Sequence, residues 1–279
     1  MKTGLGRREM ALVGFLVWGL AAPVLAELPV RTPPDRFDVV AIDPGHGGED
    51  FGARGSSGLR EKDLVLDVSR RLARRLEKHG LRVLLTRDDD RFVPLVARNR
   101  QANAQRADLF LSIHANASRS RKPAGVETFF LSLEASDEAS EKLAERENQS
   151  SGGRGSGGDL SDPLAALLGD MTADDAMRES NVFANLANSE LASLGPFPSR
   201  GVKQAPFVVL MSAEMPSALV EIGFVSNPVE EQALRTADRR EAIAAALARA
   251  VVGFGKRYDA QRGRTARMDQ RISDSARDR

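Results

Sequence analysis

Two of the chain's three histidines follow apolar, β-type runs, which is where an open α/β sheet places its ligand-binding side chains. His46 lies in the glycine-rich turn at residues 43–48, directly after the run from Val39 to Ile42, and His114 follows the run from Leu109 to Ile113. The carboxyl ends of parallel strands meet at one edge of a sheet. We therefore expect the two imidazoles to converge there, where they could bind one ion.

Glu61 adds a third group of the right type. It precedes Leu64 by three residues and Val68 by seven, which places it on the apolar side of a predicted helix. A carboxylate on a buried face is unfavourable unless it is paired or bound to a metal. Two histidines and a glutamate, with a fourth position open, form the ligand set of a catalytic zinc ion. The chain has no cysteine, so neither thiolate ligands nor disulfides are available.

Each of these residues also has a simpler interpretation. His46 could sit in an ordinary tight turn, and His114 could be a half-buried strand histidine. Glu61 could be an acid that favours the N-terminal end of the helix dipole. The third histidine, His79, follows Lys78 at a helix C-terminus, where an imidazolium suits the dipole, and we expect it at the surface.

Glu221 is the candidate general base. A catalytic zinc site needs a group that takes a proton from water and passes it on. Glu221 lies in the middle of the apolar run from Leu219 to Phe224, where a solvated surface acid is not expected. The alternative is a buried ion pair between Glu221 and an arginine such as Arg87 or Arg98.

The elements that must position these residues alternate along the chain. This alternation predicts a single α/β domain, with a doubly wound, mostly parallel sheet and helices on both faces. The predicted strands are 39–42, 82–86, 109–113, 126–131, 207–210 and 218–224, and the predicted helices include 61–79, 95–106 and one that starts at 238.

The regular pattern is interrupted by a helical insertion at residues 134–194, with a Gly/Ser-rich linker at 150–159. Insertions of this length in compact domains usually have a function. The domain itself is expected to span residues 38–258. The polar tail at 259–279 is expected to be disordered because it has almost no apolar residues.

Residues 1–26 have the features of a signal peptide: early positive charge, an apolar run from Met10 to Ala22, and small residues up to a cleavage site after Ala26. A membrane anchor is the alternative, but the run is short for a span of about 20 residues. Cleavage would leave a lead segment at 27–37 and no stable membrane span. The net charge of +1 excludes the strong basic excess typical of nucleic-acid partners.

Four ordered motifs resemble the zinc-dependent N-acetylmuramoyl-L-alanine amidases of bacterial cell separation, the amidase 3 family. They are Ile42–Gly48, Glu61-Lys62, Ser112–Asn116 and Val220–Asn227. The resemblance implies one zinc ion per chain at His46, Glu61 and His114, with Glu221 as the catalytic residue. It also implies a periplasmic enzyme that cleaves the amide between N-acetylmuramic acid and L-alanine of peptidoglycan, and Asn116 is a candidate for positioning this substrate. Many periplasmic relatives carry a separate wall-binding domain, which we do not expect here.

Related amidases with such an insertion resemble a self-inhibited design, in which an inserted helix covers the zinc until an activator protein displaces it. Ala139, Leu143 and Glu147 share one helical face, so Glu147 is the candidate that would block the zinc, while Glu141 and Glu145 stay in water. A fully solvated helix is the alternative. The candidate docking face for the activator, which could instead pack on the domain, is Leu164, Leu167, Leu168 and Met171.

Two other functions stay open. A zinc peptidase could cut within the stem peptide, using the same ligands on a different bond. A non-catalytic wall-binding or activator protein could use the same scaffold, although such proteins usually lose a ligand or the base, and all four residues are present here.

Overall fold

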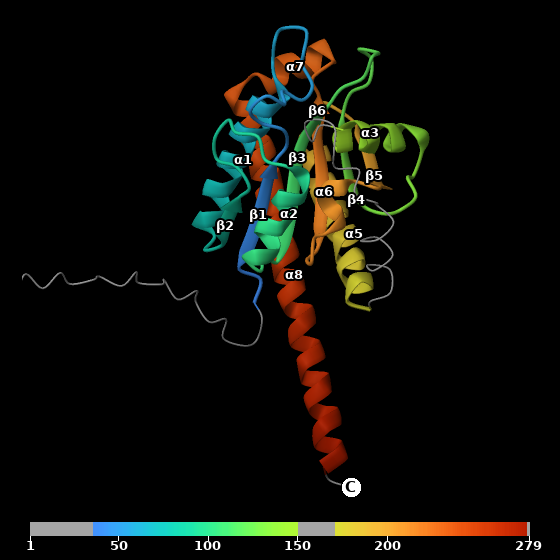
Figure 1. The fold of residues 1–279 in the computed structure, drawn as a ribbon. Coiled ribbons are helices and arrows are strands. Elements are labelled where there is room, and N and C mark those ends of the chain that lie inside the picture. The colour runs from blue at the N-terminus through green and yellow to red at the C-terminus, as the bar shows by residue number, and fades with distance from the viewer. Residues whose placement is uncertain (1–35, 150–170, 278–279) are drawn as a thin grey trace, which may run out of the picture. The chain divides into compact units, whose positions relative to one another are not determined.

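The computed structural model describes residues 36–149 and 171–277. The proposed signal peptide, the Gly/Ser linker and the leucines of the proposed docking face lie outside these residues. Within them, the strands form one six-stranded sheet in the order β2-β1-β3-β6-β4-β5 (Figure 1). Its strands are β1 (Val39–Pro44), β2 (Arg82–Leu85), β3 (Leu109–Asn116), β4 (Val126–Leu131), β5 (Ser199–Ala205) and β6 (Ser217–Phe224).

All neighbouring strands are parallel except β4 and β6, which run antiparallel. The helices cover both faces of this sheet, as the sequence predicted. On one face α1 (Glu61–Lys78), α5 (Met171–Ala192) and α8 (Ala237–Arg277) pack around a common core. On the other lie α2 (Leu95–Ala104), α3 (Glu138–Gln149) and α6 (Val208–Met211). The short helix α7 (Pro228–Leu234) follows β6.

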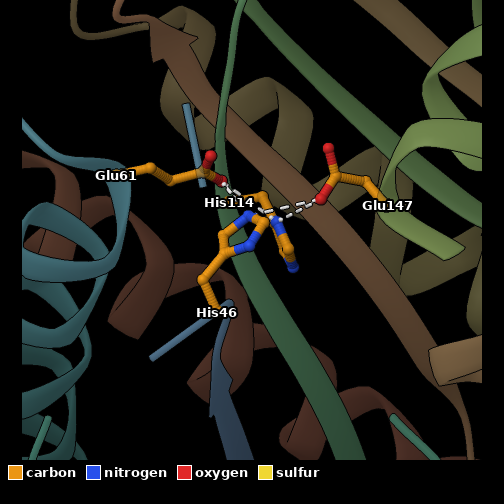
Figure 2. Close-up of side chains that lie close together, drawn as sticks. All are labelled: His46, Glu61, His114 and Glu147. Atoms are coloured by element: carbon orange, nitrogen blue, oxygen red, sulfur yellow. Dashed lines mark hydrogen bonds and ion pairs between the residues drawn. The ribbon is translucent and has the colours of Figure 1, made fainter. Parts of the chain in front are cut away.

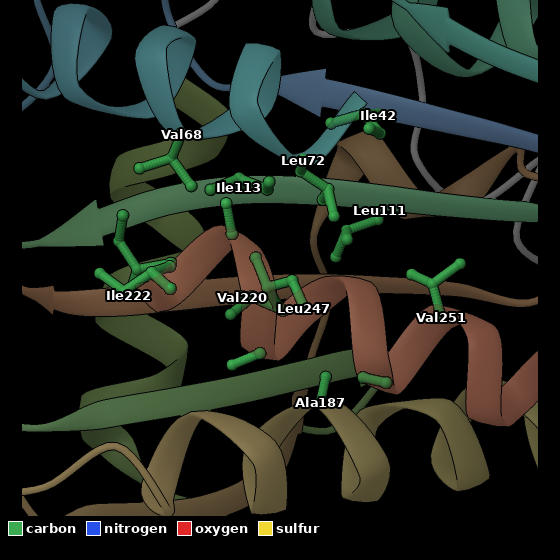
Figure 3. Close-up of a cluster of buried hydrophobic side chains, with 14 of the residues drawn as sticks. Ile42, Val68, Leu72, Leu111, Ile113, Ala187, Val220, Ile222, Leu247 and Val251 are labelled. Atoms are coloured by element: carbon green, nitrogen blue, oxygen red, sulfur yellow. The ribbon is translucent and has the colours of Figure 1, made fainter. Parts of the chain in front are cut away.

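The apolar stripe of α1 explains how Glu61 is placed. Residues spaced by four along this helix are completely buried, because that spacing keeps them on one side. They are Leu64, Val68, Leu72 and Leu76. Figure 3 shows Val68 and Leu72 against Ile113 and Leu111 of the sheet. Glu61, at the start of the same stripe, is therefore directed toward the carboxyl edge of β1 and β3. No helix of the described residues is long and apolar enough to cross a membrane.

One predicted strand was wrong and one was missed. The run from Phe207 to Leu210 is the start of helix α6, and the strand that pairs with β4 is β5, at Ser199–Ala205. This strand has the sequence SRGVKQA, which lacks an apolar run. β5 lies at the edge of the sheet, where β4 is its one hydrogen-bonding neighbour. Because the strand is polar, its sequence shows little of the apolar pattern that predicts a strand.

The insertion at 134–194 is smaller than expected. Helix α5 is part of the core, since Phe183 and Ala187 are completely buried beside Val220 of β6. These buried residues of α5 therefore cover the sheet. Of the described helices in this range, only α3 lies over the other face of the sheet, beside the candidate site.

The boundaries of the packed domain also differ from those expected. Phe37, assigned to the lead segment, is buried and packs against Phe254 and Tyr258. The tail was expected to be disordered from Asp259, but the structure shows helix α8 continuing to Arg277. The Asp259 carboxylate accepts a 2.7 Å hydrogen bond from the Phe37 amide. The tail has no proline and a single glycine, so nothing in its sequence breaks the helix that precedes it.

Candidate metal and catalytic site

The two histidines meet at the carboxyl edge of the sheet because β1 and β3 are adjacent and parallel, with Pro44 opposite Ile113. Their ring centroids are 4.9 Å apart. Glu61 reaches them from the first turn of α1, and Glu147 from α3 on the opposite side (Figure 2). The structure thus brings together the three predicted ligands and the residue predicted to block the zinc.

The four side chains present one donor atom each to a common point. His46 Nε2 lies 3.1 Å from Glu61 Oε1 and 3.3 Å from Glu147 Oε2. His114 Nδ1 lies at the same two distances, 3.1 and 3.3 Å, from those oxygens. Two ligands of a tetrahedral ion with bonds near 2.0 Å are about 3.3 Å apart. The donor set therefore has the composition and spacing of a site that could hold a divalent metal ion.

The electrostatics of the cluster also favour a cation. Burial alone lowers the pKa of His114, but the Glu147 and Glu61 carboxylates outweigh this and raise it to about 10. His46 Nε2 is buried within 3.3 Å of both carboxylates, yet makes no hydrogen bond among the described residues. This environment is the one expected for a nitrogen that binds a metal ion together with the two carboxylates.

Further hydrogen bonds orient the ligands. Asp50 Oδ2 lies 2.8 Å from His46 Nδ1, so the carboxylate leaves Nε2 available to a metal. The two Glu61 oxygens accept backbone N–H bonds from Ala53, at 2.7 Å, and Ala115, at 2.9 Å. Sequence reasoning missed Asp50, although an acid four residues after a histidine in the same turn is a usable signal.

Glu221 lies beside this cluster on β6, in register with His114 of β3. It is completely buried, and neither of its carboxylate oxygens makes a hydrogen bond among the described residues. Burial raises the pKa of Glu221 well above its usual range, and the nearby Glu61 and Glu147 carboxylates raise it further. Burial thus favours the protonated form of this carboxyl, and a positioned carboxyl group of this kind is a candidate for proton transfer.

The alternative explanation of Glu221, a buried ion pair with an arginine, is wrong. Arg98 pairs with Asp43 at 2.9 Å, and Arg87 donates its hydrogen bonds to backbone carbonyls. Neither guanidinium contacts Glu221. The acid in the middle of the β6 run is therefore not explained by charge pairing.

Helix α3 is held over the cluster by its own polar contacts. Arg146 donates to Asn116 Oδ1 at 3.1 Å and to the Ala117 carbonyl at 3.0 Å. Leu143 and Glu147 are buried, whereas Ala139, expected on the same face, is exposed. Glu141 and Glu145 are exposed as predicted, and so is His79. Asn116, the candidate for positioning substrate, is thus engaged by α3 in this structure.

Comparisons with known proteins identify the family of this chain and agree with its fold. Residues 40–252 match the family described as N-acetylmuramoyl-L-alanine amidase. The chain is 38% identical over 226 residues to the amidase AmiA of Escherichia coli K12, covering 80% of this chain and 78% of that protein. It is 40% identical over 223 residues to AmiC of Escherichia coli O6:H1, covering 78% of this chain but 53% of AmiC.

The solved structure of the amidase AmiC2 of Nostoc punctiforme aligns with a TM-score of 0.58 and 29% identity, covering 79% of this chain and 98% of that one. The α/β fold of this chain is thus shared with amidase catalytic domains. The chain belongs to the N-acetylmuramoyl-L-alanine amidase family, which is a family of enzymes. It spans about half the length of AmiC.

Proposed function

We propose that this chain hydrolyses the amide between N-acetylmuramic acid and L-alanine of peptidoglycan, with one Zn²⁺ held by His46, Glu61 and His114. The observation that carries the proposal is the buried set of four donor atoms, all within 4.8 Å of one another, beside a Glu221 carboxyl that makes no hydrogen bond among the described residues. The donor set of nitrogen and oxygen suits zinc. Membership of the amidase family supports the choice of bond.

The chemistry follows from the residues around the ion. Bound zinc polarises a carbonyl and lowers the pKa of water to about 7. Glu221 accepts the proton of the attacking water and delivers it to the leaving nitrogen. A C–O bond forms at the lactyl carbonyl as the C–N bond breaks, which yields a carboxylate on the sugar and a free amine on L-alanine. Burial raises the pKa of Glu221, which strengthens the carboxylate as an acceptor of the water proton.

The decisive test is the mass of the products released from purified peptidoglycan. The proposed activity frees intact stem peptides from the glycan, and a chelator should abolish it until Zn²⁺ is restored. A stem-cutting peptidase would instead leave truncated peptides on the glycan. If neither the full chain nor a folded chain lacking residues 136–176 releases any product, the result would favour a non-catalytic wall protein.

We further propose that α3 inhibits the enzyme. Glu147 occupies the fourth position of the donor set, which a catalytic zinc ion keeps open for water or substrate. Arg146 also engages Asn116 and the Ala117 carbonyl. An activator protein that docks on the insertion would withdraw both side chains. Export by the signal peptide at 1–26, a periplasmic location and a role in septal wall splitting complete the proposal.

The capping residue of α3 provides a graded test of this inhibition. Asp137 Oδ1 accepts bonds from the Ser140 amide and hydroxyl, at 2.8 and 2.7 Å, and Asp137 Oδ2 lies 3.2 Å from Lys203 Nζ. Asp137→Ala removes a cap worth about 1 kcal/mol, so we expect basal stem-peptide release to rise by up to about fivefold.

Glu138→Ala, at the exposed neighbouring position, is the matched control for this variant. The Ser140 hydrogen bonds lower the pKa of Asp137 to about 2. The cap is therefore fully formed above the ordinary pKa of the group and is lost as pH falls toward about 2, so the effect should be constant across neutral pH. Equal release by Asp137→Ala and the control would show that the cap does not limit docking of α3.

A further inference from the structure

Two buried arginines lie behind the candidate site, outside the donor set. Arg87 follows β2 and Arg98 lies on α2, and both rank among the largest side chains that are fully buried. One carboxylate, Asp43, pairs with Arg98. Burial and the charge of Arg98 lower the pKa of Arg87 to about 10, so the Arg87 guanidinium remains charged at neutral pH. Burying two cations beside one anion is unfavourable unless their hydrogen bonds are satisfied.

These hydrogen bonds go to three successive carbonyls of the turn that presents His46. Arg87 Nε and Arg98 Nη1 donate to the Pro44 carbonyl at 3.0 and 2.7 Å. Arg87 Nη2 donates to the Gly45 carbonyl at 2.7 Å, and Arg98 Nη2 to the His46 carbonyl at 2.9 Å. The planar, rigid fork of a guanidinium can reach adjacent acceptors in this way, whereas the single ammonium of lysine cannot.

The turn needs this support because its backbone is constrained on two sides. His46 has a φ of 58°, in the left-handed region that is unfavourable for a non-glycine residue. On the other side, Gly45 lies so close to the His114 ring that a Cβ there would come within 2.4 Å of it. The turn is thus fixed between the His114 imidazole and the two guanidiniums.

Arg87 also links the turn to a second ligand. Its Nη2 atom donates at 2.9 Å to the carbonyl of Lys62, the residue that follows Glu61. One guanidinium therefore contacts the segments that carry His46 and Glu61. The segment that carries His114 is tied in separately, because the Gly45 amide donates to the Ile113 carbonyl at 3.0 Å.

We propose that Arg87 and Arg98 are positioning residues that hold His46 in its strained turn and so set the spacing of the metal ligands. The inference rests on the proposed metal-binding function of those ligands. Groups that orient ligands from outside the donor set typically change metal affinity by 10–100-fold when replaced. The arginines should therefore control how tightly and in what geometry the ion is held.

The test measures metal binding by the full chain, independently of catalysis. Arg87→Lys and Arg98→Lys keep the positive charge but lose the fork, and each should bind Zn²⁺ about 10–100-fold more weakly in competition with a chromophoric chelator. Bound Co²⁺ should also show a shifted visible absorption band, a signature of altered ligand geometry. Arg91→Lys and Arg100→Lys, at exposed positions near each site, should match the unchanged protein in both measurements.

A wild-type zinc affinity and cobalt spectrum in the folded Lys variants would overturn the inference. If those variants fail to fold, Asp43→Asn provides the second test, because it removes the carboxylate that pairs with Arg98 at 2.9 Å without changing size. A weaker affinity and a shifted spectrum are expected there too, and unchanged values would overturn the inference. Failure of the amidase proposal looks different: metal binds normally, but no stem peptides are released.

Discussion

Glu221→Gln should reduce stem-peptide release by a factor of about 10²–10⁴ while the protein keeps its metal. The glutamine has the same shape, but it cannot take a proton from water or return one to the leaving nitrogen, and general acid–base catalysis contributes a factor of this size. The zinc content of the purified variant, its product yield and its thermal unfolding are the three measurements. His114→Ala is the contrasting variant, since it should lose the ion itself.

The same substitution should stabilise the metal-free fold. Neither carboxylate oxygen of Glu221 makes a hydrogen bond among the described residues, so no such bond is lost. The pKa of Glu221 is higher in the folded protein than in the unfolded chain. The stability that Glu221 contributes is therefore full below the unfolded-state pKa, and it is lost as pH rises from that pKa toward the folded-state pKa. Glu221→Gln removes this penalty and should unfold at a higher temperature at neutral pH. Unchanged activity in the metal-loaded variant would exclude Glu221 from the mechanism.

Much of the fold and of the donor set could be predicted from the sequence because local patterns determine them. A histidine after an apolar run lies at the end of a strand, and a parallel sheet brings such ends to one edge. Spacings of three, four and seven residues direct Glu61 and Glu147 inward from their helices. His46, His114 and these two glutamates were therefore predicted as neighbours although about 100 residues of sequence separate His46 from Glu147.

What could not be predicted depends on contacts between distant segments. Strand β5 is polar, and only its pairing with β4 reveals it. Helix α5 looked like part of an insertion because periodicity does not show which partner an apolar face meets. The roles of Arg87 and Arg98 depend on three carbonyls about 40–55 residues away in sequence. Every residue has a backbone carbonyl, so the sequence does not show which carbonyls an arginine will contact.

Glu147→Ala should raise the basal activity of the full chain by about 10–100-fold in the absence of any activator. A buried contact between charged groups is worth about 1.5–3 kcal/mol, and each 1.4 kcal/mol shifts an equilibrium tenfold. Loss of Glu147 removes its contacts with His46 and His114 and opens the fourth ligand position. Product release by the purified chain measures the effect, with Glu145→Ala on the exposed face of α3 as the matched control.

Deletion of residues 136–176 should raise activity further, because it also removes the contacts of Arg146 with Asn116 and Ala117. The deletion should also lower stability, because Leu143 of α3 is buried in the core on the face of the sheet that carries α2, α3 and α6. Removal of α3 exposes that core to water. Glu147→Ala keeps this packing. It therefore separates the effect of the Glu147 carboxylate from the effect of α3 covering the site. If the folded deletion and Glu147→Ala both match the unmodified chain, α3 packs on the domain without inhibiting it. If only the deletion is active, the helix excludes substrate by its bulk and Glu147 is not the inhibitory group.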